Sequence, residues 1–105
     1  MKNIRYSATI TVVSGIGTVV LSSFYPMKHS GGSIEQVIIT PPTSDSEYDF
    51  YILNPESTRI YQEKNKKGTF NSDKQVNTIA GIHTLGIENG TDGDYTVELT
   101  FRGDW

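Results

Sequence analysis

The sequence predicts an all-β protein, an antiparallel β-sandwich of about seven or eight strands with jelly-roll or immunoglobulin-like topology. Residues 94–102 alternate polar and apolar side chains at every step, which is the pattern of a strand with one buried face. Turn signals rich in glycine, proline and asparagine recur about every ten residues, and no segment shows helical periodicity. A small barrel is the alternative architecture. The side chains expected to face the core from residues 94–102 are Tyr95, Val97, Leu99 and Phe101.

Length and composition place the whole chain, residues 1–105, in a single domain with one core. The net charge of −3 argues against sequence-independent binding of nucleic acid, because a phosphate-binding surface needs an excess of basic residues. The chain has no cysteine, which excludes disulfides and thiolate chemistry. No apolar run approaches the ~18 residues of a membrane-spanning helix. We therefore expect neither nucleic acid nor a membrane among the partners.

The N-terminal part of the chain is expected to form a β-hairpin. Residues 4–13 alternate as a first strand, the turn at residues 14–17 contains two glycines, and residues 18–24 form the second strand. Residues 25–32 contain a proline and paired glycines, which mark a connection rather than a further element.

The middle of the chain is expected to contribute three strands. Residues 33–40 form a strand that ends at Pro41, because proline cannot donate to a sheet ladder. Residues 47–53 carry large apolar groups on both faces, as a central strand does. A short strand at residues 58–63 is expected to pair with them as a hairpin, and the polar residues 64–68 are expected to form a loop.

The C-terminal part is predicted as one long hairpin. Residues 75–87 alternate throughout and are expected to form a single strand. The turn at residues 89–93 contains Asn-Gly and Asp-Gly, the dipeptides preferred where a hairpin needs positive φ. We expect this turn to return the chain as the closing strand at residues 94–102.

Three carboxylates near this last turn are the metal candidates. Glu88, Asp92 and Asp94 offer hard oxygen ligands of the kind that calcium takes. Turn geometry explains the same residues, and their spacing departs from the EF-hand pattern. The turn interpretation is preferred, so the sequence predicts no metal site and no cofactor, and these three residues remain the candidates for calcium.

The other chemistry-bearing side chains also have structural interpretations. His83 is expected inside a strand as a partly buried structural side chain, and His29 lies in the glycine-rich connection. No Gly-x-Ser-x-Gly elbow is present to hold a nucleophile, so we expect no enzyme and no catalytic residues. The lysines of residues 64–67 are interpreted as a solvated loop. The six tyrosines could stack on sugars, but core packing is expected to take most of them.

Two residues at the C-terminus are the candidates for partner binding. Trp105 is a large aromatic side chain at a chain end, where it either folds back or inserts into a neighbouring molecule. Arg102 closes the last predicted strand and is the second candidate. Both are assigned to partner binding as a hypothesis.

Four segments carry a resemblance in pattern and length, at residues 37–42, 48–52, 82–90 and 93–97. Over about two thirds of the chain the sequence resembles small β-sandwich accessory proteins of tailed-phage virions. That resemblance implies a protein without catalytic residues, which decorates a capsid or joins head and tail components, commonly as a trimer. Residues 48–53 and 94–99 also resemble jelly-roll modules appended to secreted bacterial peptidases.

We therefore expect a non-enzymatic virion structural protein, a capsid decoration or stabilising protein that binds a protein lattice. Its partners would be a capsid or tail protein and further copies of itself, as a trimer, with assembly in the host cytoplasm and a final location in the virion. Exposed strand edges and the chain termini are the expected contact elements. The alternative is a carbohydrate-binding module of the jelly-roll type, stabilised by calcium.

Overall fold

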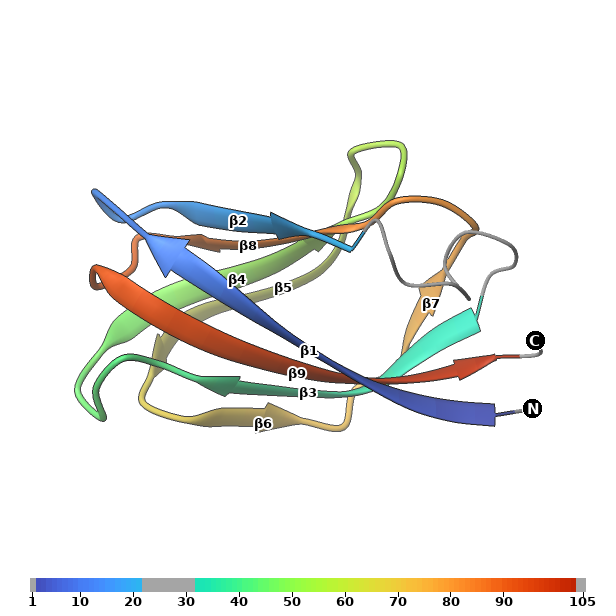
Figure 1. Ribbon diagram of the computed structural model, residues 1–105, viewed down its shortest axis with the longest axis horizontal. Helices are drawn as coiled ribbons and strands as arrows, with labels where there is room; N and C mark the ends of the chain where they lie inside the picture. Colours follow the sequence, from blue (N-terminus) through green and yellow to red (C-terminus); the bar gives the residue numbers. More distant parts are fainter. Residues whose placement is uncertain (1, 22–31, 104–105) are drawn as a thin grey trace.

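Two antiparallel sheets pack face to face in the computed structural model, which describes residues 2–21 and 32–103 (Figure 1). One sheet has the strand order β1-β9-β3-β6, with β7 also paired to β3, and the other has the order β2-β8-β4-β5. Within the described ranges no helix is long and apolar enough to cross a membrane. The strands are β1 (Lys2–Val12), β2 (Gly17–Val20), β3 (Gly32–Thr40), β4 (Glu47–Leu53), β5 (Arg59–Lys67), β6 (Phe70–Ser72), β7 (Val76–Thr78), β8 (Thr84–Glu88) and β9 (Gly93–Gly103).

The strand order selects the jelly roll from the two predicted topologies. Strands β6 and β7 pair with successive halves of β3, so together they act as one interrupted strand. The chain then alternates between the sheets at every step except the β4–β5 hairpin, which is the arrangement of a double-sheet jelly roll. The prediction of an all-β sandwich is confirmed.

Strand β9, the feature with the clearest sequence pattern, lies at the centre of its sheet. It pairs with β1 along eleven residues and with β3 on its other side. Its apolar side chains are all buried and face the second sheet, as predicted. Tyr95 packs edge-on against Tyr48 of β4, with ring centroids 5.3 Å apart, so the two sheets meet through aromatic contact. Burial of the two sheets' apolar faces is the main source of stability.

The prediction of a single strand at residues 75–87 is wrong, because the structure divides this segment between the two sheets. Val76–Thr78 pairs with β3, whereas Thr84–Glu88 pairs with β2 and β4. Gly81 lies between them with φ of 127°, a conformation that interrupts an extended strand. Alternation of side chains continues through both pieces, so the pattern alone could not reveal the break. The short strand β6 was not predicted.

The two predicted hairpins at residues 4–24 and 75–102 are wrong in their pairing, although both turns are present. The turn at residues 89–93 joins β8 to β9, which belong to different sheets. Likewise β1 and β2 are bridged only at Val13 and Ile16 before they diverge into different sheets. In a jelly roll these turns cross from one sheet to the other rather than closing a two-stranded ladder.

The loop predicted at residues 64–68 is mostly strand. Strand β5 continues to Lys67, where it pairs with Glu47 at the start of β4. Because β5 lies at the edge of its sheet, its lysines reach solvent while the backbone remains in the ladder. The predictions for β3 and β4 are confirmed, and β4 is an inner strand with both faces buried.

Gly17 provides a test of the junction between the sheets. A Cβ atom at this position would lie 2.3 Å from the Thr11 carbonyl oxygen and 2.9 Å from Cγ2 of Ile10, so β1 and β2 must separate to accept one. We expect Gly17→Ala to lower the free energy of unfolding by about 1–3 kcal/mol. Thr18→Ala, at the exposed next position, is the control and should change stability by less than about 0.5 kcal/mol. Urea denaturation measures both, and equal effects of the two changes would contradict this description of the junction.

Candidate functional site

Several connecting turns gather at the end of the sandwich opposite the paired chain ends Lys2 and Gly103 (Figure 1). The turn at residues 89–93 is the centre of this end. The Gly90 amide donates to the Gly15 carbonyl oxygen at 3.1 Å. The Thr91 amide donates to the carbonyl oxygen of Glu47, at the start of β4, and the Glu47 amide donates to the Thr91 side-chain hydroxyl. Hydrogen bonds therefore link the β1–β2 turn, β4 and the β8–β9 turn into one continuous surface.

The three metal candidates lie near one another in the chain but are engaged separately. Glu88 forms a two-pronged ion pair with Arg59, with N···O distances of 2.7 and 3.1 Å. Asp92 accepts the Gly15 amide at 3.0 Å, and Asp94 accepts the Thr11 hydroxyl at 2.8 Å. Over residues 2–21 and 32–103, no group of three carboxylate or imidazole side chains is placed to hold a metal ion. The structure thus gives each carboxylate its own structural partner.

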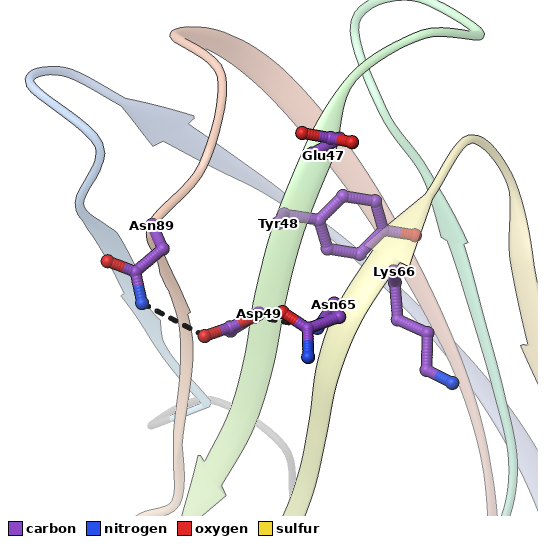
Figure 2. Close-up of a pocket in the computed structure, with 6 residues that line it drawn as sticks. All are labelled: Glu47, Tyr48, Asp49, Asn65, Lys66 and Asn89. Carbon is purple, nitrogen blue, oxygen red and sulfur yellow. Dashed lines mark hydrogen bonds between the residues drawn. The ribbon is translucent and has the colours of Figure 1, made fainter.

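A pocket of about 260 Å³ lies on the β2-β8-β4-β5 sheet at this end of the molecule (Figure 2). Most of its lining residues are polar, and two of them are acidic. Its lining residues come from β4, β5 and the start of the β8–β9 turn. They are Glu47, Tyr48, Asp49, Asn65, Lys66 and Asn89.

Asp49 is the buried charge of this pocket, with 8% of its surface exposed. Its carboxylate accepts the backbone amide of Asn65 at 2.8 Å and the side-chain amide of Asn89 at 2.9 Å, as Figure 2 shows. The Asn65 hydrogen bond, followed by that of Asn89 and the charges of Lys64 and Arg59, lowers the pKa of Asp49 against the opposing effect of burial. Asp49 is therefore held as a carboxylate at neutral pH.

Both asparagines held by Asp49 have left-handed backbones. Asn65 has φ of 58° and lies in a β-bulge, where β5 has one residue more than β4 between its paired positions. Asn89 has φ of 51° and begins the turn to β9. Asparagine is among the few non-glycine residues that adopt this conformation readily. The carboxylate thus stabilises two strained positions at once, which assigns it a structural role.

Sequence reasoning missed Asp49, although a signal was present. An acidic residue between Tyr48 and Phe50, within a strand predicted to be covered on both faces, requires hydrogen-bond donors inside the fold. Its partners could not be named in advance. They depend on the bulge in β5, a segment predicted as loop, and on the path of the β8–β9 turn.

The described tyrosines of the core provide no exposed stacking surface. Tyr48 donates its hydroxyl to the Gly68 carbonyl oxygen at 2.7 Å, and burial, with Tyr95 nearby, raises its pKa to about 12. Tyr51 faces outward, but the Arg59 guanidinium lies 4.0 Å above its ring and leaves it 9% exposed. Tyr61 and Tyr95 are also buried. The aromatic platform of a carbohydrate-binding module is not formed by these four residues.

His83 is fully buried, as a structural side chain, but in the connection before β8 rather than within a strand. Its Nδ1 lies 3.2 Å from the Gly81 carbonyl oxygen, and its buried Nε2 has no hydrogen-bond partner. Burial lowers the pKa of His83 more than the Gly81 contact raises it. The imidazole is therefore neutral in the folded protein near neutral pH. His29 lies outside the described residues.

Of the two candidates for partner binding, only Arg102 falls within the structure. It is exposed on β9, and its guanidinium lies 3.8 Å from the Glu35 carboxylate, at the bulge of β3. Trp105 lies outside the described residues. The lysines of residues 64–67 extend along the exposed edge of β5, and Lys66 is 3.7 Å from Glu63.

The chain matches no protein-family model and no curated protein. The chain is similar in structure to the Drosophila NLP core, whose crystal structure is described as giving insight into pentamer formation and histone binding. The alignment covers 99% of this chain and 100% of the Drosophila chain, at 14% sequence identity and a TM-score of 0.54. That likeness supports the fold. A cryo-EM structure of the extra small virus particle of the prawn Macrobrachium rosenbergii aligns with 100% of this chain and 82% of its own, at 13% identity and a TM-score of 0.34. The second likeness is too distant to carry an argument.

Replacing Asp49 tests its role as the clamp for the β5 bulge and the β8–β9 turn. Asp49→Ala leaves the Asn65 amide and the Asn89 side chain without their acceptor, so we expect a loss of about 2–4 kcal/mol in the free energy of unfolding. Because the pKa of Asp49 is lowered on folding, its contribution is complete above the unfolded pKa of about 3.9 and is lost as pH falls through the folded value. Asp45→Ala, at an exposed turn position, is the control. Urea denaturation at pH 7 and pH 3 measures both, and similar losses for the two variants would refute the clamp.

His83 predicts a second pH dependence. Since burial lowers its pKa below the ordinary value of 6.5, stability is complete above about pH 6.5 and declines as pH falls through that value and below. In His83→Gln the melting temperature should change less between pH 7 and pH 5 than in the parent protein. His29 is present in both proteins, so the difference isolates His83. Identical pH profiles would show that His83 is not held neutral.

Proposed function

We propose that this chain is a non-enzymatic structural protein that associates with copies of itself and binds an assembled protein lattice. The lattice we propose is a viral capsid, which the protein decorates and stabilises, and its location would then be the virion. The single observation that carries the proposal is an exposed apolar surface on the β2 side of the sandwich. This surface, called here the β2 patch, consists of Val20 and Ile82, which are 48% and 51% exposed.

The β2 patch lies where a second copy could reach both side chains. Val20 ends β2 and pairs with Thr84, which lies two positions after Ile82, and the Leu21 amide donates to the His83 carbonyl oxygen at 2.8 Å. Among the described strands, β2 has a neighbour on one side in its sheet. Apolar side chains beside an unpaired strand edge favour association with another chain.

Oligomer formation is also supported by the comparison with the Drosophila NLP core. The structure of that protein is described in terms of pentamer formation, and its fold aligns with this chain over nearly all of its length. The resemblance to phage accessory proteins implies a trimer, whereas the Drosophila structure is described in terms of a pentamer. The number of copies in the oligomer therefore has to be measured. In either case, a surface completed only in the assembly would stabilise the assembled state by mass action.

The non-enzymatic part of the proposal is supported by how the polar side chains are used. The buried carboxylate of Asp49 holds the β5 bulge and the β8–β9 turn, and the Glu88 carboxylate is paired with Arg59. Both carboxylates are thus engaged in structural contacts, and Glu47, the other acid that lines the pocket with Asp49, is exposed. Carbohydrate binding, the alternative, is less well supported because the described core tyrosines are buried.

Solution mass tests self-association through the β2 patch. We expect the parent protein to be a homo-oligomer in size-exclusion chromatography with light scattering, and Val20→Ser with Ile82→Ser to shift it to monomer without loss of the folded circular-dichroism spectrum. Ile16→Ser, which removes an exposed apolar side chain elsewhere, should leave the mass unchanged. A monomeric parent protein would refute self-association.

Particle binding tests the capsid part of the proposal. Capsids assembled from the coat protein of the same genome should co-sediment with the parent protein and resist heat at a higher temperature when it is bound. An oligomer that neither sediments with these capsids nor alters their melting would leave self-association intact and exclude the decoration role.

A further inference from the structure

The turn between β1 and β2 exposes two large apolar side chains side by side. Val13 and Ile16 are 66% and 63% exposed, the highest values among the large apolar residues that the structure describes. They form an antiparallel bridge, so their side chains project from the same face of the turn. Turns of this kind usually carry polar residues at the surface. We call this pair the apolar tip.

Hydrogen bonds hold the apolar tip in one conformation. Val13 and Ile16 exchange backbone hydrogen bonds of 3.1 and 3.3 Å around Ser14 and Gly15, whose positive φ values of 57° and 83° suit a tight two-residue turn. The β8–β9 turn then fixes Gly15 on both sides, since its amide donates to Asp92 and its carbonyl oxygen accepts from Gly90. A rigid surface loses less entropy when it binds, so the tip is prepared for contact.

Acidic side chains lie beside the apolar tip. Asp92 and Asp94 are exposed and are joined by hydrogen bonds to the turn and to the strand that leads into it. Glu47, also exposed, is tied through its backbone to Thr91 of the same β8–β9 turn. Lysines also occur on β5, which is separated from β8 by β4 in the strand order, and Lys67 pairs with Glu47 across the β4–β5 ladder. The apolar tip therefore has the carboxylates of Asp92 and Asp94 beside it.

We propose that the apolar tip docks a segment of a partner protein that combines apolar and basic side chains. The apolar residues of the partner would cover Val13 and Ile16, and its lysines or arginines would face the neighbouring carboxylates. The same carboxylates disfavour an anionic lipid surface, which makes a protein the better match. This inference rests on the proposed function, for which it names the contact surface and the chemistry of the partner.

A defined probe tests this chemistry without the natural partner. A short fluorescent peptide that alternates leucine and lysine should bind the full chain in a polarisation assay, and more weakly as salt is raised. Peptides that alternate leucine with glutamate, or serine with lysine, should bind about tenfold more weakly or not at all, because each lacks one half of the match. Val13→Ser with Ile16→Ser should weaken binding of the leucine–lysine peptide by about tenfold or more.

Matched controls separate this inference from the proposed function. Val20→Ser with Ile82→Ser changes the β2 patch and should leave peptide binding unchanged, whereas the apolar-tip variant should retain the parent oligomer mass and melting temperature. The inference would be overturned if the parent protein did not bind the peptide, if the tip variant bound it equally well, or if the β2-patch variant lost binding to the same extent. Binding to vesicles of anionic phospholipid in place of the peptide would also overturn it. None of these outcomes bears on the oligomer mass or capsid sedimentation, which test the proposed function.

Discussion

The position of the carboxylate of Asp49 is the constraint on which one end of the molecule depends. From an inner strand it holds Asn65 in the β5 bulge and Asn89 at the start of the β8–β9 turn. The β8–β9 turn also fixes Gly15 of the β1–β2 turn, because Gly90 and Asp92 form hydrogen bonds with Gly15. A single buried charge thus holds one strand bulge and one turn directly, and through that turn it supports a second turn. Its burial is tolerated because both oxygens have donors.

The two exposed apolar surfaces differ in how the fold supports them. The apolar tip lies on a tight turn fixed by several hydrogen bonds, whereas the β2 patch lies beside an unpaired strand edge and the connection that contains His83. A fixed protrusion suits insertion into a complementary partner, while an open edge suits lateral contact between equivalent molecules. The proposed self-association and the proposed docking of a different protein would therefore use separate surfaces.

How far the sequence could predict the fold depends on which interactions set each element. The buried face of β9 and the ends of β3 and β4 followed from alternation and from Pro41, because these are local properties. The division of residues 75–87 did not, because a strand that changes sheet keeps its alternation and only Gly81 marks the break. Residues 64–67 were misassigned because edge strands tolerate lysine. For the site, Glu88, Asp92 and Asp94 were considered because they lie close together in the sequence, whereas Asp49 was missed because its donors come from distant segments.

Lys2 pairs with Gly103 at the end of the long β1–β9 ladder that is farthest from the β1–β2 turn. The sandwich is 38 Å long, and the apolar tip and the described chain ends lie at opposite ends of that axis (Figure 1). A molecule docked through its tip therefore points Lys2 and Gly103 away from the surface it covers. An array of such molecules would present this end of the β1–β9 ladder as a second, outer layer.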